Sequence, residues 1–292
     1  MVRPLRLQYA GAFYHITVRG NRRQDIYVDD VDREHFVSIL SDVAYSRNVI
    51  CYAYCLMSNH YHLEIETPDG NLSAFMRDLN GIVSQDYNKR HGKTGHLFQG
   101  RYHSYLIEKE TYLMEVARYV VLNPVRAGLV KQPEQWRWSS YRATLGQVES
   151  PSFLATYALL KFFHNRRPQA QKNYQKFVSE GINVPSPFIE IEQGIILGSP
   201  QFVHEVWNSN DITDEIKELP REDRIVGRPM LGDLFDKNMT KEARDQTIVI
   251  AHIRCGYLLS EIARHLGLDQ STVGKISKAR RIPNSRPDPI LK

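Results

Sequence analysis

The sequence predicts an α+β fold, a ferredoxin-like sandwich with a mostly antiparallel sheet, followed by a mainly helical C-terminal region. In the first half, short β-branched and aromatic stretches alternate with longer stretches of helical periodicity, in the order strand, helix, strand, strand, helix, strand, helix. Two of the strand-like stretches are separated only by a tight turn, which favours an antiparallel pair. After residue 145 the strand-like pattern weakens and helical patterns follow.

The first two elements are a strand and a helix. Residues 11–19 are rich in β-branched and aromatic side chains and end at Gly20, which predicts a strand followed by a turn. Residues 31–47 carry apolar side chains at helical spacing, including Phe36 and Val43 on one stripe. We therefore expect a helix that packs this stripe against the sheet.

A pair of strands comes next, over residues 50–56 and 60–66, around the turn Met57-Ser58-Asn59. In the second strand the apolar residues, among them Tyr61 and Ile65, alternate with histidine and glutamate. Because alternate side chains of a strand point to opposite faces, this strand is expected to have one apolar and one polar face.

The remaining elements of the first half are a helix, a strand and a helix. Asn71 or Ser73 is expected to cap a helix that runs to about His91, where Gly92 ends it. A strand is expected over residues 102–107. The next helix begins near Glu110, and it is expected to end at Asn123 because Pro124 disfavours helical geometry in the residue before it.

The chain is expected to divide into three parts, residues 1–145, 146–239 and 240–292. Their net charges are +3, −3 and +5, so the last part is basic although the whole chain carries only +5. Residues 152–180 are expected to be helical, and prolines interrupt the rest of the middle part. The basic third part points to an anionic polymer as partner, although a solvated charged face explains the charge equally well.

Composition narrows the class of protein. The chain is 42% hydrophobic and 24% charged, as expected of an ordinary globular protein and not of a disordered one. No window has the roughly 18 apolar residues of a membrane span, and no apolar segment follows the charged N-terminus, so we expect neither a membrane protein nor an exported one. The three cysteines, Cys51, Cys55 and Cys255, form no CxxC motif, which argues against a disulfide framework or a structural zinc site and for a reducing cytoplasm.

Two histidines provide the first chemical signal. His60 and His62 are two residues apart on a predicted strand, so their imidazoles point from the same face and lie close enough to bind one divalent metal ion. A pair of this kind on a half-exposed strand is more commonly solvated surface. A metal site therefore requires further ligand groups close to these two histidines.

The helix that ends before Pro124 offers a partner for them. Tyr119 and Asn123 are four residues apart and share one face of that helix. Asn123 can supply a carbonyl oxygen as a third ligand, and Tyr119 would point at the same ion. The alternative is equally open on spacing alone: Tyr119 is then a half-buried amphipathic side chain, and Asn123 caps the end of the helix.

The third part of the chain contains a helix-turn-helix pattern. Residues 259–266 and 271–281 have helical spacing, and Gly267 between them allows a sharp turn. An ordinary helical hairpin with a basic tail is the simpler alternative, but the turn glycine, the small Ala263 and the polar second helix together favour DNA binding. The side chains expected to face the DNA are Gln270, Ser271, Thr272, Lys275, Lys278 and Arg281.

Several separated motifs resemble those of the single-tyrosine HUH transposases, in particular the REP-associated tyrosine transposases. The run Met57-Ser-Asn-His-Tyr-His-Leu63 is similar to the HUH motif, and residues 118–130 are similar to the helix that carries the tyrosine. Gly95-His-Leu-Phe-Gln-Gly-Arg-Tyr102 and Trp138-Ser-Ser-Tyr141 also match. The resemblance covers residues 1–145, whereas the remainder resembles only loosely the longer members that append a helical tail.

The resemblance implies a function and assigns residues to it. Tyr119 would be the nucleophile, and His60, His62 and Asn123 would hold Mg²⁺ or Mn²⁺. The reaction would be nicking and strand transfer of single-stranded or hairpin DNA through a 5′-phosphotyrosine, on repetitive palindromic sequences. Ser58 stands where the family often has proline, which should alter only the turn. A second tyrosine, Tyr87, is the alternative nucleophile.

Residues 1–145 would then be the catalytic domain and residues 240–292 a DNA-binding tail, in a cytoplasmic, nucleoid-associated monomer or homodimer. Two other functions stay open: a transposase-derived regulator that binds DNA without catalysis, and a metal-dependent phosphodiesterase that activates water. Short basic runs in the first domain are expected to contact phosphates. They comprise Arg19, Arg22, Arg23, Lys89, Arg90, Lys93 and Arg101.

Overall fold

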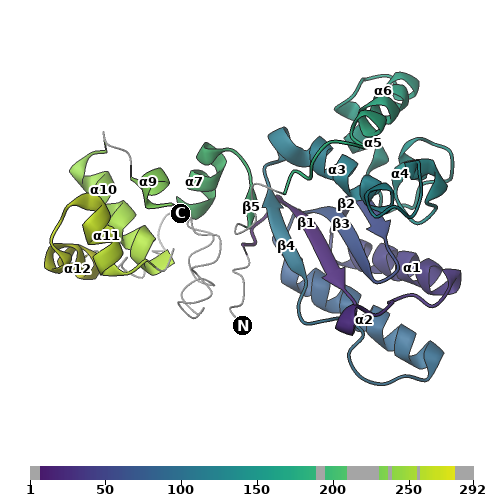
Figure 1. Ribbon diagram of the computed structural model, residues 1–292, viewed down its shortest axis with the longest axis horizontal. Coiled ribbons are helices and arrows are strands. Elements are labelled where there is room, and N and C mark those ends of the chain that lie inside the picture. Colours follow the sequence, from purple (N-terminus) through teal and green to yellow (C-terminus); the bar gives the residue numbers. More distant parts are fainter. Residues whose placement is uncertain (1–6, 189–194, 209–229, 236–238, 255–256, 280–292) are drawn as a thin grey trace, which may run out of the picture. The chain divides into compact units, whose positions relative to one another are not determined.

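The computed structural model describes residues 7–188, 195–208, 230–235, 239–254 and 257–279. The chain forms two compact units, one of residues Arg6–Ser199 and the other of Met1–Leu5 with Pro200–Lys292. The predicted division at residues 145 and 239 remains a prediction. Figure 1 shows the elements of both units.

The larger unit is built on a five-stranded sheet of order β2-β3-β1-β4-β5. Its strands are β1 (Ala12–Arg19), β2 (Ile50–Leu56), β3 (His60–Thr67), β4 (His103–Ile107) and β5 (Ile196–Leu197). All neighbours pair antiparallel except β4 and β5, which are parallel. The predicted α+β class with a mostly antiparallel sheet is confirmed, and β5 is the strand that the sequence pattern did not indicate.

Alternation along β1 and β3 gives the sheet two different faces. Tyr61, Leu63 and Ile65 are fully buried on one face, as the apolar half of the β3 pattern predicts. The opposite face of the same strand carries histidine and glutamate. Since β1 pairs with β3 in a fixed register, with His15 opposite Glu64, the polar side chains of both strands lie on this second face.

Helices α1 (Asp30–Ser46) and α2 (Leu72–His91) cover the apolar face (Figure 1). Phe36 of α1 packs against Tyr61, and the Tyr61 hydroxyl donates a hydrogen bond to Asn80 of α2. Helix α2 ends as predicted, because Gly92 adopts the left-handed conformation (φ 58°) that a C-terminal cap requires.

The polar face is covered by α3 (Lys109–Arg126), with α4 (Tyr141–Thr144), α5 (Thr156–Lys161) and α6 (Arg167–Glu180) beyond it. The segment expected to be helical over 152–180 is thus two helices. The expectation that the preceding helix ends at Asn123 is wrong, because α3 continues through Pro124 to Arg126. Proline removes the N–H that would bond the Val120 carbonyl, but the Asn123 side-chain amide donates to that oxygen instead, at 3.2 Å.

In the smaller unit all elements described are helical, apart from the turns between them. They are α7 (Pro200–Asn208), α9 (Leu231–Leu234), α10 (Lys241–Val249), the π-helical turn η6 (Ile250–Arg254), α11 (Leu259–Leu266) and α12 (Gln270–Ala279). Gly267 between α11 and α12 has φ 64°, and Ile262, Ala263 and Val273 are buried between the helices. The predicted helical character of this region is confirmed.

Two further expectations concern the whole chain. Cys51 and Cys55 are buried free thiols, whereas Cys255 lies outside the described residues. Among the helices that the structure describes, none combines the length and apolar character needed to cross a membrane.

Candidate active site

The two predicted histidines lie side by side on the polar face of the sheet. His60 and His62 project from the same face of β3, with their ring centroids 5.0 Å apart. His62 is only 6% exposed and His60 is half-buried, so the pair is not a solvated surface feature. The pair has the spacing that a shared metal ion needs, and the metal site itself stays a prediction.

A third histidine, which the sequence analysis did not single out, completes this group. His15 lies on β1, diagonally across from His62, and its Nε2 is 3.0 Å from Nδ1 of His62. The two rings are stacked at an interplanar angle of 7°. Because His15 occupies Nδ1, the other nitrogen of His62 is left free. That Nε2 is buried, and no described protein group hydrogen-bonds to it.

Burial keeps these imidazoles neutral at pH 7. It lowers the pKa of His15 to about 3 and that of His60 to about 4, the latter with help from the positive charge of Arg19. Burial also lowers the pKa of His62 well below its ordinary value. A neutral imidazole has a nitrogen lone pair to share with a metal ion, so the three rings are in the protonation state that ligation requires.

Tyr119 lies over the same histidines, on the helix that covers this face. Its ring centroid is 6.0 Å from that of His62 and 5.6 Å from that of His15, and both contacts are edge-to-face. Phe188 packs against Tyr119 at 5.1 Å, and the guanidinium of Arg126 is 5.3 Å from the ring centre. Tyr119 is thus held by packing, with one cation beside it.

Asn123 has a role that neither sequence alternative described. Its side-chain nitrogen donates to two carbonyl oxygens of its own helix, those of Tyr119 (2.9 Å) and Val120 (3.2 Å). These bonds orient the amide and occupy its donor, which leaves Oδ1 as an acceptor. Asn123 therefore supports the helix at Pro124, and its oxygen is the atom that could face an ion.

The residues present fit a hard divalent cation. Two neutral imidazole nitrogens and an amide oxygen are ligands that Mn²⁺ accepts, and Mg²⁺ takes the oxygen more readily than the nitrogens. No group of three or more histidine, cysteine or acidic side chains arranged to hold a metal occurs within the described residues. A site here would therefore need the Asn123 oxygen or ligands from the substrate.

Glu64 is the second buried polar residue that the sequence analysis did not single out. It lies two residues beyond His62 on the same face, is fully buried, and neither carboxylate oxygen has a hydrogen-bond partner in the described structure. Burial raises the pKa of this carboxyl well above its usual range, because the protein interior disfavours the charged form. The sequence signal that could have identified Glu64 is the alternation of side chains along β3, which places it on the same face as His62.

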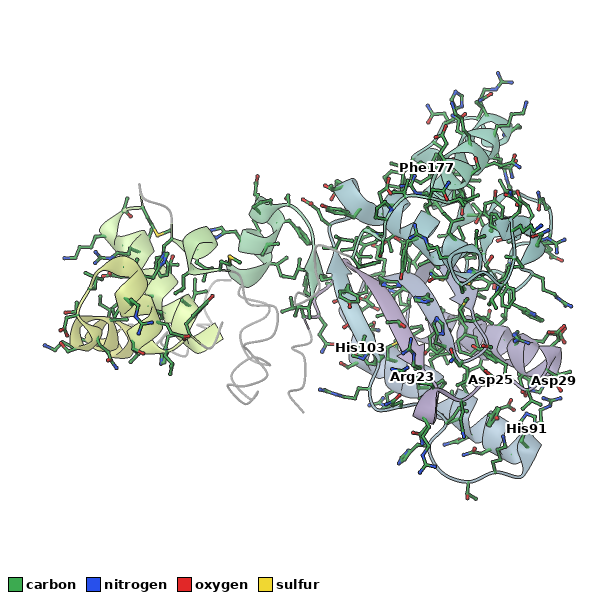
Figure 2. All side chains as sticks on the ribbon, in the orientation of Figure 1. Arg23, Asp25, Asp29, His91, His103 and Phe177 are labelled. Atoms are coloured by element: carbon green, nitrogen blue, oxygen red, sulfur yellow. The ribbon has the colours of Figure 1, made fainter. Side chains whose placement is uncertain are left out.

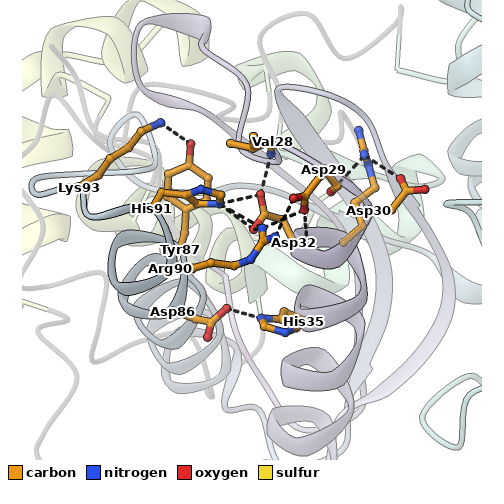
Figure 3. A network of polar contacts seen from close by, with 11 residues as sticks. Val28, Asp29, Asp30, Asp32, His35, Asp86, Tyr87, Arg90, His91 and Lys93 are labelled. Atoms are coloured by element: carbon orange, nitrogen blue, oxygen red, sulfur yellow. Dashed lines mark hydrogen bonds and ion pairs between the residues drawn. The ribbon is translucent and has the colours of Figure 1, made fainter.

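Tyr87, the alternative nucleophile, lies away from the histidines. It is buried on α2, which packs on the apolar face of the sheet, and its hydroxyl accepts a hydrogen bond from Lys93 at 2.8 Å. Its ring contacts His91 at 4.6 Å. Figure 3 shows Tyr87 beside Lys93 within a polar network of α1 and α2. Of the two tyrosines, Tyr119 is the one that contacts His62.

The predicted phosphate contacts of the larger unit fall into two groups. Arg90 is held in ion pairs with Asp29 and Asp32, and Lys93 is bonded to Tyr87, so these two cations have protein partners (Figure 3). The other members have exposed side chains: Arg19, Arg22, Arg23, Lys89 and Arg101.

Three of the exposed arginines lie at the end of β1. Arg19 is directly opposite His60 in the strand register. Arg22 and Arg23, the latter labelled in Figure 2, have φ of 53° and 61°, a conformation that residues other than glycine rarely adopt. Strained turns of this kind concentrate at functional sites. The turn places basic side chains at the same end of β3 as His60.

The predicted recognition helix is α12, and most of its expected contacts are described. Asp269 caps it, accepting from the backbone N–H of Ser271 at 2.7 Å. The side chains of Gln270, Ser271, Thr272 and Lys275 are exposed. The side chain of Lys278 and the whole of Arg281 lie outside the described structure.

Part of the chain matches the sequence model of a known family. Residues 8–123 match the sequence model of the IS200-like transposases, a segment that includes His60, His62, Tyr119 and Asn123. The transposase resemblance inferred from the motifs is thereby confirmed. Among curated proteins, none matches this chain.

Two solved structures are similar to part of the chain. One is a REP-associated tyrosine transposase bound to a REP hairpin, 21% identical, with a TM-score of 0.44, covering 53% of this chain and 92% of that one. The other is a protein of Deinococcus radiodurans, described as a transposase, 20% identical, with a TM-score of 0.30, covering 40% of this chain and 95% of that one. Each solved chain is thus matched by about half of this chain or less.

Proposed function

We propose that the unit Arg6–Ser199, most of which matches the IS200-like transposases, is a metal-dependent DNA nickase and strand transferase. Its substrate is single-stranded or hairpin DNA, and Tyr119 is the nucleophile. The observation that carries the proposal is the edge-to-face contact of Tyr119 with His62, whose ring lies 5.0 Å from that of His60. A tyrosine and two neutral imidazoles on one face are the groups that this reaction needs.

In the proposed reaction, the Tyr119 hydroxyl oxygen attacks the phosphorus of the scissile phosphodiester. A tyrosine–phosphate bond forms, the bond from phosphorus to the 3′ oxygen breaks, and that oxygen takes up a proton as the phenol loses one. The products are a 5′-phosphotyrosine and a free 3′-OH. A 3′-OH of another strand can reverse the step, because the ester conserves the bond energy.

The chain's own residues would prepare this attack in three ways. His60, His62 and the Asn123 oxygen would hold the metal ion, which supplies Lewis-acid stabilisation of charge on the phosphate. Phe188 and His15 fix the Tyr119 ring by packing. Arg126, 5.3 Å from the centre of that ring, places a positive charge beside it.

The deciding experiment is Tyr119→Phe, assayed for a covalent adduct with a 3′-labelled hairpin oligonucleotide that carries single-stranded flanks, because the 5′-phosphotyrosine joins the protein to the fragment that holds the 3′ end. The adduct should disappear while binding of the oligonucleotide is unchanged. Tyr87→Phe is the matched control and should form the adduct as the wild type does. An adduct in Tyr119→Phe would overturn the assignment, and cleavage without any adduct would favour the water-activating phosphodiesterase.

For the smaller unit, the exposed polar face of α12 favours a second function, DNA binding by a helix-turn-helix. A protein that had lost its chemistry could act as a regulator through this helix alone. Lys275→Gln tests it, since loss of one phosphate contact should weaken duplex binding and reduce the salt-dependence slope by about 0.9. Wild-type affinity and slope in this variant would indicate a structural hairpin.

A further inference from the structure

A basic surface lies within the otherwise acidic middle part of the sequence. Between Glu149 and Glu180 the chain has no acidic residue and five basic ones. This stretch forms α5, α6 and the turn between them. We call the exposed side chains of this hairpin the α5–α6 surface, and define it by Tyr157, Lys161, Phe162, Arg166, Arg167 and Lys172.

The cations of this surface have no acidic partners among the described residues. The ion pair found on α6 is that of Lys176 with Glu180, at the other end of the helix. Basic side chains on a protein surface commonly pair with nearby carboxylates, as Arg77 does with Asp78 on α2. Four unpaired cations close together raise the local positive potential, which attracts a polyanion.

The surface also has a hollow and exposed aromatic rings. A depression of about 460 Å³ lies at the turn, lined by Arg166, Lys172, His164 and Asn173 among others. Phe162, at the C-terminal end of α5, is 43% exposed, and Tyr157 is 64% exposed. Lys161 lies 4.7 Å from the Tyr157 ring centre. Cations that follow a backbone, combined with aromatic rings on which bases stack, are the means by which proteins bind single-stranded nucleic acid.

Packing connects this surface to the proposed nucleophile. The guanidinium of Arg118, the residue before Tyr119, lies 4.2 Å from the ring centre of Phe177 on α6 (Phe177 is labelled in Figure 2). Arg126 donates to the carbonyl of Val184, beyond α6, at 2.7 Å. Helix α6 and the segment after it are thus joined to α3 through Arg118 and Arg126.

The α5–α6 surface and the contact with Arg118 lie toward opposite ends of α6. Ten residues of helix separate Arg167 from Phe177, which is about 15 Å at 1.5 Å per residue, the span of a few nucleotides. A strand held at the α5–α6 surface would therefore be held in a constant position relative to Tyr119.

We propose that the α5–α6 surface binds the unpaired nucleotides that flank the DNA segment cleaved at Tyr119. The inference rests on the proposed function, which supplies the DNA substrate, and assigns a further binding surface to it. Phosphates would contact Arg166 and Lys172, and a base would stack on Phe162. Because stacking and phosphate contacts tolerate any base, the surface would hold the strand without reading its sequence.

The test uses the full chain and fluorescence anisotropy with a labelled single-stranded oligonucleotide, titrated at several salt concentrations. Arg166→Gln with Lys172→Gln should reduce the slope of log affinity against log salt by about 1.4, at about 0.7 per contact. Phe162→Ala should weaken affinity by about 5- to 100-fold without changing the slope, because it removes stacking and no charge. A duplex of the same sequence should be affected less by the Phe162 change, since its bases are already stacked.

Two matched controls lie on α1 and α2, which cover the opposite face of the sheet. Arg77→Gln removes an exposed charge and Tyr45→Ala an exposed ring, and neither should change affinity. The inference would be overturned if the variants of the α5–α6 surface bound single-stranded DNA as tightly as these controls. It would also be overturned if they lost affinity for duplex DNA alone. Adduct formation in the surface variants at saturating DNA separates the two proposals: if the wild type forms no adduct, the proposed function fails while the binding result stands.

Discussion

Two clusters of buried polar residues in the larger unit differ in how well their polar atoms are hydrogen-bonded. On the polar face of the sheet, His62 and Glu64 are buried with polar atoms that have no described partner. Between α1 and α2, Asp32 is buried equally well, but it accepts from the Val28 N–H at 2.6 Å and bonds with Arg90 and His91 (Figure 3). One cluster leaves its polar atoms unsatisfied, and the other satisfies them within the chain.

The contrast separates a network that stabilises the fold from buried polar groups that the fold leaves without a partner. Buried polar groups are nearly always hydrogen-bonded, because an unpaired one costs free energy. A fully bonded network such as that of Asp32 stabilises the packing of two helices. Free nitrogens on neutral imidazoles are instead available for binding, which is why the metal site is proposed at β3 and not at the larger cluster of charges.

The largest effect is expected on cleavage when a proposed metal ligand on β3 is removed. His60→Ala and His62→Ala each remove one of few ligands, and metal stabilisation amounts to several kcal/mol, so cleavage should fall by about 10³-fold or more. Cleavage of a labelled oligonucleotide with added Mn²⁺ and calorimetric titration with Mn²⁺ alone would measure both consequences. Full activity in excess chelator, or unchanged Mn²⁺ affinity in both variants, would contradict the metal site.

A substitution in the α1–α2 network should instead lower stability and leave activity unchanged. Asp32→Ala leaves His91 and the Val28 N–H without their acceptor, whereas Arg90 keeps its ion pair with Asp29. It should lower the free energy of unfolding by about 2 kcal/mol, a value reduced for the partial exposure of Arg90. Adduct formation per folded molecule should be unchanged. Denaturant unfolding beside Asp30→Ala, an exposed neighbour that forms only surface ion pairs, would show whether the loss is specific.

The same network predicts a pH dependence. Burial acts to raise the pKa of Asp32, but bonds from Val28, His91 and Arg90 outweigh it, so the pKa lies below its ordinary value. A lowered pKa contributes stability that is present above the unfolded value near ~3.9 and is lost as pH falls through the folded one. Asp32→Ala should therefore flatten the acid limb of the stability curve. An unchanged acid limb would mean that this carboxylate is not stabilised in the folded protein.

A smaller change in the free energy of unfolding, and an increase instead of a decrease, is expected at Glu64. A buried carboxyl without a partner costs free energy, so Glu64→Leu should raise the free energy of unfolding by about 1–2 kcal/mol at pH 7. Because the folded pKa is raised, the wild type loses stability as pH rises above ~4.3, and the gain in the variant should grow in the same direction. Glu64→Gln keeps the shape and a polar group, and serves as the comparison. A destabilised Glu64→Leu at neutral pH would show that the carboxyl has a favourable role.

How much could be predicted from sequence depended on whether the signal was local. Strand alternation placed His60 and His62 on one face, and Gly92 marked the end of α2, because both signals lie within a few residues. The bond of His15 to His62 was missed, since it depends on the register of β1 against β3, 47 residues apart in sequence. Arg90 was expected to contact phosphate because a charge run does not reveal an acidic partner 61 residues away.

The end of α3 shows why a local rule can also fail. Proline disfavours helix before it, yet α3 passes through Pro124, because the Asn123 amide replaces the missing donor. The rule considers the backbone alone, whereas this compensation comes from a side chain. Asn123 consequently combines a structural role, through Nδ2, with a proposed metal-binding role, through Oδ1.

The smallest predicted effect separates these two roles of Asn123. Asn123→Ala should cost about 1 kcal/mol of stability, because the Val120 carbonyl loses its donor, and it should weaken Mn²⁺ binding as well. Asn123→Asp keeps an oxygen and adds charge, so it should lose similar stability while Mn²⁺ affinity is kept or rises. Adding Pro124→Ala to Asn123→Ala restores a backbone N–H that can bond Val120, so the double variant should recover stability without recovering Mn²⁺ affinity. Thermal unfolding and Mn²⁺ titration of the three variants measure the two roles separately. Wild-type Mn²⁺ affinity in Asn123→Ala would show that the residue serves only the helix. The ion would then be held by His60, His62 and the substrate.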